Sequence, residues 1–367
     1  MPAHSQDHVP LWSWLAPFAA SLWLAALFIP GMSTSAWFWQ IPAALLTGLA
    51  VFAAVHHAEV IALRLGEPFG SLVLAIAVTI IEVSLIISFL LAATPGSENV
   101  ARDTVYSTVM IVLNGVVGLC LVAGGKRHYE QSFRLEGVSS ALSILGTLAI
   151  FTLIFPNYTL SAEGPFYSAR QLLFIAFVVL ALYGVFIFVQ TVRHRDYFGE
   201  TDDNSSGSDN LHHRPSMRLT IISGGWLVLS LALVVLLAKG LSSPISQMIA
   251  SVGLPTSFLG VIVALIVLLP ESVASLRAAM ANRLQSSLNL ALGSAIATIG
   301  LTIPVVALVS LFMGIRLPLG IDPLSTVLLV TTLFIATLTL GTGRTTVLHG
   351  AVHLVIFAVF IFTAAVP

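Results

Sequence analysis

Apolar stretches long enough to cross a lipid bilayer recur along the whole chain. A helix spans a bilayer core with about 20 apolar residues, and such stretches follow one another here with short polar breaks. Charged residues make up 8% of the sequence and apolar residues 57%, whereas a soluble domain has roughly 25% charged residues. A soluble fold of this composition could not cover its surface with polar groups. The sequence therefore predicts an all-α polytopic membrane protein.

Eleven spans are expected from the hydropathy of the chain. They lie at residues 12–31, 37–56, 69–93, 104–124, 137–155, 169–192, 219–240, 256–281, 286–313, 324–341 and 345–366. The eighth contains Arg277, whose long side chain must reach the membrane surface or mark an earlier end. The single cysteine, Cys120, excludes a disulfide and a thiolate metal site within the chain. No basic run is present, so nucleic acid is not an expected partner.

Basic residues between the spans predict the orientation of the chain. The side that includes the N-terminus carries eleven Lys and Arg residues, and the other side carries the remaining four of the 15. Cytoplasmic loops carry the excess of positive charge in membrane proteins. We therefore expect a bacterial inner-membrane protein with a cytoplasmic N-terminus and a periplasmic C-terminus. An even number of spans would scramble this charge asymmetry.

One hydrophilic segment, residues 193–218, divides the chain and is rich in acidic residues, serine and glycine. Such a composition cannot be buried and favours a disordered cytoplasmic linker. The predicted organisation is an N-terminal segment with an extra first helix (1–36), a five-helix repeat (37–192), the linker (193–218) and a second five-helix repeat (219–367). Five is an odd number, so the second repeat must enter the membrane in the opposite direction, as in many secondary transporters.

Two acidic residues lie deep within predicted spans, and each is the only acid in its span. Glu82 occupies the third span and Glu271 the eighth. An ionisable residue at this depth costs about 2.5–3.5 kcal/mol on insertion scales and indicates a functional site. Pro270 directly precedes Glu271 and frees a helix carbonyl, which suits a hard cation that prefers oxygen ligands. A protonated carboxyl group that merely ties two helices together, or an ordinary packing kink at the proline, is the structural alternative.

Small polar residues accompany these acids and could complete a cation or proton site. Thr79 precedes Glu82 by three residues, so the two share a helix face. Asn114 lies mid-span, and Asn289 and Ser294 lie in the ninth span near Ser286 and Gly293. Hydrogen bonds between helices would explain the same residues without an ion.

Four further residues could act in gating or proton transfer. His57 and Glu59 lie at the cytoplasmic end of the second span, where they could form a mouth for ions or simply a solvated helix end. His349 and His353 lie four residues apart in the last span and share a helix face. Such a pair could relay protons or bind a metal, or it could form an interior hydrogen-bonded pair.

Several of these residues occur in patterns that resemble a known family. The stretch 59–67, the sixteen-residue spacing from Gly66 to Glu82, the pair Gly293-Ser294 and the segment 343–345 resemble the CAX branch of the calcium/cation antiporter superfamily. The likeness extends over nearly the whole chain and is greatest to the bacterial calcium/sodium–proton antiporters of that branch. It implies exchange of Ca²⁺ or Na⁺, with K⁺ as a further candidate, for H⁺.

The sequence departs from that family pattern beside both acids. The family has Gly-Asn-x-x-Glu in each repeat, and here the stretches read 78–82 Val-Thr-Ile-Ile-Glu and 267–271 Val-Leu-Leu-Pro-Glu. The acid of the family's last-helix motif is replaced by His349. Fewer oxygen ligands leave room for monovalent ions as well as Ca²⁺.

The expected function is secondary active antiport. Glu82 and Glu271 would hold either the metal ion or protons, so that exclusive occupancy couples the two fluxes. The transported cation would be the only ligand, without a cofactor. Two alternatives are a channel or passive scaffold, which needs no proton coupling, and an intramembrane enzyme, whose usual motifs HExxH and GxSxG are missing from the sequence.

Overall fold

The structure, a computed structural model, describes residues 10–26, 37–66, 69–92, 96–199 and 215–367. The chain divides into two compact units, Met1–Ala92 with Asp209–Gln247 (unit 1) and Ala93–Ser208 with Met248–Pro367 (unit 2). The central part of the linker, 200–214, lies outside the described residues.

Unit 1 consists of long apolar helices. Its helices are α1 (Trp12–Ala26), α2 (Trp37–Leu65), α3 (Phe69–Ala92) and most of α8 (Met217–Ser251). Helix α2 packs against both α1 and α3. Leu233 and Leu237 of α8 form a buried cluster with Ala20 of α1.

Unit 2 contains nine α-helices within the described chain. They are α4 (Val100–Met110), α5 (Val117–His128), α6 (Leu135–Ala149), α7 (Ala169–Phe188), α9 (Phe258–Met280), α10 (Leu284–Ala297), α11 (Ile303–Met313), α12 (Pro323–Leu340) and α13 (Val347–Ala365). Short strands β1 (Gln131–Ser132) and β2 (Arg344–Thr345) pair antiparallel. This pair fixes the turn after α5 to the turn after α12.

Two of the membrane-spanning helices of unit 2 contain a π-helical segment near their middle. The π segment Ile111–Val116 joins α4 to α5, and the π segment Thr298–Thr302 joins α10 to α11. Two further π segments, Ile150–Ile154 and Val189–Arg193, extend α6 and α7 at their ends. A π turn inserts an extra residue into the helix and occurs frequently at functional sites.

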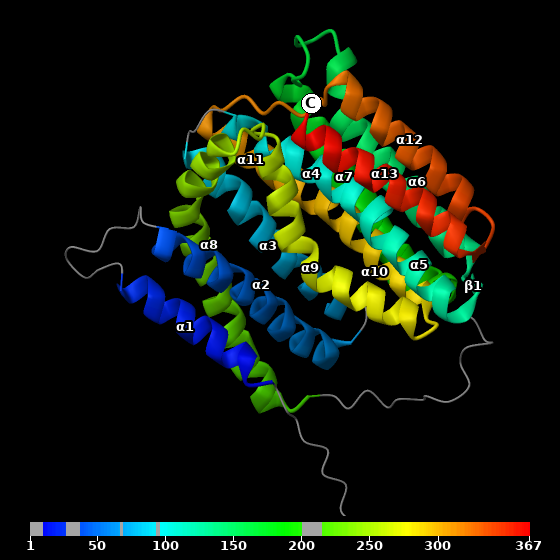
Figure 1. Ribbon diagram of the computed structural model, residues 1–367, viewed down its shortest axis with the longest axis horizontal. Helices are drawn as coiled ribbons and strands as arrows, with labels where there is room; N and C mark the ends of the chain where they lie inside the picture. Colours follow the sequence, from blue (N-terminus) through cyan, green and yellow to red (C-terminus); the bar gives the residue numbers. More distant parts are fainter. Residues whose placement is uncertain (1–9, 27–36, 67–68, 93–95, 200–214) are drawn as a thin grey trace, which may run out of the picture. The chain divides into compact units, whose positions relative to one another are not determined.

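The α4–α5 helix is the centre of unit 2. In its most apolar 18-residue stretch 89% of the residues are buried, whereas in the corresponding stretch of α13 only 17% are buried. Helix α4 packs against α9, and α5 packs against α13 (Figure 1). The close approach of α5 and α13 depends on small residues, because a Cβ atom on Gly350 would lie 2.7 Å from the Gly118 carbonyl oxygen.

Ten helices of the described chain are long and apolar enough to cross a membrane. They confirm the predicted polytopic all-α class. The first expected span, 12–31, is described only as far as Ala26. Two helices extend beyond the expected spans, because α2 continues past residue 56 to Leu65 and α8 continues past residue 240 to Ser251. The polar residues that suggested a helix end at these positions are accommodated within the helices.

Candidate functional site

Glu82 is a buried residue of α3, one of the helices of unit 1. Its side chain is only 1% exposed, and Thr79, one turn earlier, is also buried. The Thr79 hydroxyl donates a hydrogen bond of 2.8 Å to the Ala75 carbonyl oxygen. With its hydrogen engaged in the helix, the hydroxyl oxygen keeps lone pairs that can face a cation. This face of α3 therefore offers a carboxylate and a neutral oxygen.

Glu271, on α9 of unit 2, is buried, with 8% of its surface exposed. Pro270 is part of the same continuous helix and has no N–H to give to the Ile266 carbonyl. Ser275, one turn after Glu271, is fully buried, and its hydroxyl makes no hydrogen bond among the described residues. Two oxygens, the Ile266 carbonyl and the Ser275 hydroxyl, thus flank this carboxyl group along α9. Ser275 is missed by the sequence because a lone serine in a span carries no signal.

Asn114 and His353 are brought together at the centre of unit 2. Asn114 lies in the π segment between α4 and α5, and both side chains are fully buried. His353 Nδ1 lies 3.1 Å from Asn114 Oδ1, and Asn114 Nδ2 donates to Thr332 Oγ1 at 2.9 Å. On the other side of the imidazole, Thr339 Oγ1 lies 2.8 Å from His353 Nε2. A buried polar chain thus connects the π segment with α12 and α13.

His349 has different surroundings from His353 although both lie on α13. Its Nδ1 accepts a hydrogen bond of 3.4 Å from the Thr346 backbone N–H, as part of the cap of the helix. The two histidines therefore have separate environments, one at the helix start and one in the core. The sequence pattern could not distinguish them.

Asn289 and Ser294 of α10, which the sequence also singled out, make no described hydrogen bond to the buried polar side chains around Asn114 and His353. Asn289 Nδ2 donates to the Phe198 carbonyl oxygen at 2.6 Å, and its Oδ1 accepts from Gln285 Nε2 at 2.8 Å. Phe198 belongs to the short 3₁₀ turn Arg195–Phe198 that follows α7. Asn289 thus fastens the start of the linker to α10, while Ser294 is half-buried further along the helix.

His57 and Glu59 differ sharply in their surroundings within unit 1. His57 is fully buried, and its Nε2 lies 3.1 Å from the Ser13 carbonyl oxygen. Its ring centroid lies 5.2 Å from that of Trp14 and 6.4 Å from that of Trp226. Glu59 is exposed and lies 3.8 Å from His56 Nδ1. His57 therefore joins α2 to α1 and α8, whereas the Glu59 side chain lies at the surface.

No group of three or more His, Cys, Asp or Glu side chains is placed to hold a metal ion among the residues that the structure describes. Neutral oxygens would have to supply most ligands of any bound cation. Carbonyls and hydroxyls are suitable for hard cations such as Ca²⁺.

The chain matches the family model described as sodium/calcium exchanger protein over residues 17–192 and 222–366. It is 51% identical over 362 residues to y4hA, a candidate ionic transporter of Sinorhizobium fredii, covering 98% of this chain and 97% of that one. It is 38% identical over 315 residues to the sodium-potassium/proton antiporter ChaA of Escherichia coli, covering 86% and 85%.

The fold is also that of a solved exchanger. The structure of native YfkE matches with a TM-score of 0.71 and 17% sequence identity, over 97% of this chain and 99% of that chain. The expected resemblance and the expected transporter class are confirmed, and the channel and enzyme alternatives are excluded by the family. This multi-span membrane protein belongs to the sodium/calcium exchanger protein family.

Proposed function

We propose that this antiporter exchanges cytoplasmic Ca²⁺ or Na⁺, with K⁺ as a further candidate, for external H⁺ by alternating access. The observation that carries the proposal is the burial of Glu82 in α3 and of Glu271 in α9, each within an apolar helix of a different half of the sequence. The relatives ChaA and the vacuolar cation/proton exchanger 1a of Oryza sativa, named for proton-coupled exchange, support it.

The two halves, 37–192 and 219–367, are proposed to be inverted repeats on either side of the 193–218 linker, preceded by the extra helix in 1–36. The family model matches two separate stretches of the chain, one in each half. The third helix of each half, α4–α5 and α10–α11, also contains a π segment near its middle. Such a shared irregularity is expected if the halves have one ancestral architecture.

Glu82 and Glu271 are proposed as the metal ligands and as the acceptors of the returning protons. A buried carboxyl group is stable either as the neutral acid or as a carboxylate paired with a cation. Binding of one partner therefore excludes the other, and this exclusion couples the two fluxes. Thr79, Asn114, Asn289 and Ser294 remain the proposed auxiliary ligands, and Ser275 is added by its buried hydroxyl beside Glu271.

His353 is proposed to carry a proton within unit 2. Asn114 Nδ2 donates to Thr332, so Asn114 Oδ1 faces the imidazole and His353 Nδ1 must donate to it. The Thr339 hydroxyl has one hydrogen, which can point to the Ile335 carbonyl oxygen at 2.8 Å or to His353 Nε2 at 2.8 Å.

Rotation of the Thr339 hydroxyl therefore accommodates both protonation states of His353. When Thr339 donates to Ile335, Nε2–H can donate to Thr339 Oγ1, and the imidazole holds two protons. When Thr339 donates to Nε2, the imidazole is neutral. A buried histidine that is satisfied in both states is suited to proton transfer. His349, His57 and Glu59 remain weaker candidates for gating or relay.

The proposed location is the bacterial inner membrane, with the N-terminus and the 193–218 linker in the cytoplasm and the C-terminus in the periplasm. The distribution of Lys and Arg between the loops supports this orientation. Inorganic cations, protons and the surrounding lipid are the proposed partners, and no cofactor is required.

Everted membrane vesicles provide the test. A ΔpH is established, Ca²⁺, Na⁺, K⁺ or Mg²⁺ is added, and the collapse of ΔpH is followed with a pH-sensitive dye. We expect Glu82→Gln and Glu271→Gln each to abolish the response, since glutamine cannot carry the exchanged charge. Glu136→Gln is the matched control because Glu136 is exposed in the first turn of α6. Full exchange in both buried-site variants would refute the assignment.

A further inference from the structure

A cavity with a mixed polar and apolar lining lies at one end of unit 2, away from the residues discussed so far. Its volume is about 110 Å³, and it lies between the starts of α4, α9 and α12 and the end of α13. Helix α12 starts here and ends near β2, so the cavity and the β1–β2 pair occupy opposite ends of unit 2. In the proposed orientation this end faces the outside.

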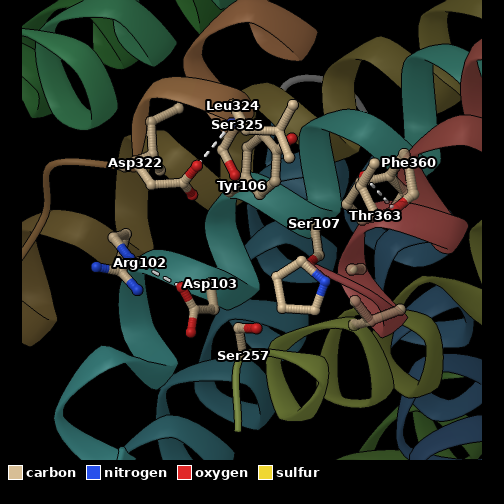
Figure 2. Close-up of a pocket in the computed structure, with 14 residues that line it drawn as sticks. Arg102, Asp103, Tyr106, Ser107, Ser257, Asp322, Leu324, Ser325, Phe360 and Thr363 are labelled. Carbon is tan, nitrogen blue, oxygen red and sulfur yellow. Dashed lines mark hydrogen bonds and ion pairs between the residues drawn. The ribbon is translucent and has the colours of Figure 1, made fainter. Parts of the chain in front are cut away.

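The cavity is lined by oxygen-bearing side chains from three helices and a loop. Figure 2 shows Tyr106 of α4 beside Asp322 and Ser325 at the start of α12, with the Asp103 carboxylate of α4 directed toward Arg102. Ser107 and Ser257 complete this part of the lining. Carboxylate and hydroxyl oxygens are the ligands that hard cations prefer.

Two of these groups are buried with hydrogen-bonding capacity left over. Tyr106 is 8% exposed, and its hydroxyl is buried near Ser325 without a hydrogen bond of standard geometry among the described residues. Asp103 is 7% exposed, and its Oδ1 accepts a bond of 2.8 Å from Arg102 Nε, which leaves its other carboxylate oxygen available to a ligand. Buried polar groups are normally satisfied, so the Tyr106 hydroxyl indicates a missing ligand.

The charge of the cavity favours a single positive ion. Among the side chains that line the cavity, the positive charge of Arg102 compensates the negative charge of Asp103. One uncompensated negative charge remains, on Asp322. The Asp322 carboxylate accepts a hydrogen bond of 3.0 Å from the Ser325 backbone N–H, and hydrogen bonds of this kind favour the charged form of a carboxyl group.

An anion is disfavoured at the same place. The first turn of α12 already donates its Ser325 N–H to Asp322 Oδ1 at 3.0 Å, so this helix end is occupied by its own cap. An entering anion would also meet two carboxylates. A divalent cation usually requires more than two acidic ligands. Only Asp103 and Asp322 are available in this lining, and Asp103 is already paired with Arg102.

We propose that this cavity binds one alkali-metal cation, Na⁺ or K⁺, through Asp103, Tyr106 and Asp322. The volume of about 110 Å³ leaves room for the ion with several water molecules. The cavity is separate from Glu271, which follows the cavity residue Val261 by ten residues in α9, about 15 Å along a helix. The proposal that the cavity binds a cation is independent of the exchange function. The further proposal that the cavity is a docking point for the transported cation at the outer face rests on the proposed function.

Thermal unfolding of the purified full-length protein in detergent tests the binding. The background is the double variant Glu82→Gln/Glu271→Gln, which removes the proposed transport site. We expect NaCl to raise the Tm of this background relative to choline chloride at equal ionic strength, because a ligand stabilises the state that it binds. Adding Tyr106→Phe or Asp322→Asn should raise the Na⁺ concentration for half of this shift about tenfold, the equivalent of roughly 1.4 kcal/mol.

Tyr167→Phe is the matched control, because the Tyr167 hydroxyl is also near the start of a helix of unit 2 but donates to the Phe151 carbonyl oxygen. It should leave the Na⁺ dependence unchanged. Absence of a Na⁺-dependent shift in the background, or an unchanged shift with Tyr106→Phe and Asp322→Asn, would overturn the proposal. A wild-type protein that shows the shift but no ΔpH-driven exchange would overturn the proposed function and leave the cavity site standing.

Discussion

The imidazole Nδ1 of His353 lies 3.1 Å from the side-chain oxygen of Asn114, 239 residues earlier in the chain. This contact joins the last helix to a π segment in the central helix of unit 2. Both side chains are fully buried, so the contact is shielded from water and its loss leaves polar groups without a substitute partner.

Removal of the imidazole should therefore destabilise the protein. His353→Leu leaves Asn114 Oδ1 without its partner in the core, at a cost of about 1–3 kcal/mol. Thermal unfolding in detergent measures this as a lower Tm. His349→Leu, which removes only a long contact of 3.4 Å at the helix start, should lower the Tm less. An equal decrease in Tm in the two variants would show that the buried hydrogen bonds around His353 do not stabilise the protein.

A second change at the same position separates structure from proton transfer. His353→Gln retains a hydrogen-bonding side chain of similar length but cannot gain and lose a proton near neutral pH. We expect it to slow proton-coupled exchange about tenfold or more, in keeping with the usual benefit of a placed proton carrier, and to change the pH dependence of what remains. Dye-based exchange assays at several pH values measure both. Wild-type rate and pH profile in this variant would exclude His353 as a proton carrier.

The close packing of α5 and α13 gives a further prediction. A Cβ atom on Gly350 would lie 2.7 Å from both the Gly118 carbonyl oxygen and the Val122 backbone nitrogen. Because backbone atoms cannot yield easily, Gly350→Ala should push the helices apart and cost about 1–3 kcal/mol, as in overpacked cores. Gly184→Ala is the control, since its Cβ meets nothing within 4 Å. A comparable Tm for the two variants would contradict the packing described.

The lowered pKa of Asp322 predicts that the free energy of unfolding depends on pH. Its lowered pKa means that its contribution is present above the unfolded value of about 3.9 and is lost as pH falls through the folded value. Asp322→Ala should lower stability by about 1 kcal/mol at pH 7, the usual effect of losing a helix cap. The difference from wild type should shrink as the pH falls below 4.

Asp322→Ser provides the corresponding control. Serine keeps a capping oxygen without a charge, so it should retain most of the stability at pH 7 and lose the additional acid dependence. Unfolding temperatures measured from pH 3 to pH 7 in the three proteins test this. A pH-independent difference between wild type and Asp322→Ala would contradict the role of the charge.

Hydropathy was sufficient to predict the spans, since ten of them appear as long apolar helices. It did not indicate that α2 and α8 extend beyond the expected spans, because polar residues near a boundary can stay helical when the tertiary structure holds them. His57 illustrates this, as it lies between Trp14 and Trp226 from two other helices. Contacts of this kind are not visible in a hydropathy pattern.

The site was only partly predictable for a related reason. Buried acids are rare enough in spans that Glu82 and Glu271 could be selected from sequence alone. Thr332 and Thr339 could not, because threonine is common in spans and acquires its role only through His353 and Asn114. Asp103 and Asp322 lie at helix starts, where acids have an ordinary capping role, so their shared cavity became apparent only in the structure.

Uphill transport in proteoliposomes is the most direct test of proton-coupled exchange at the two buried glutamates. The purified protein is reconstituted, a ΔpH is imposed with the lumen acidic, and accumulation of labelled Na⁺ or Ca²⁺ is measured with and without a protonophore. The account predicts accumulation above the external concentration that disappears when ΔpH is collapsed and that is absent in Glu82→Gln and Glu271→Gln but present in Glu136→Gln. Cation flux that ignores ΔpH, or accumulation that survives both buried-site substitutions, would contradict it.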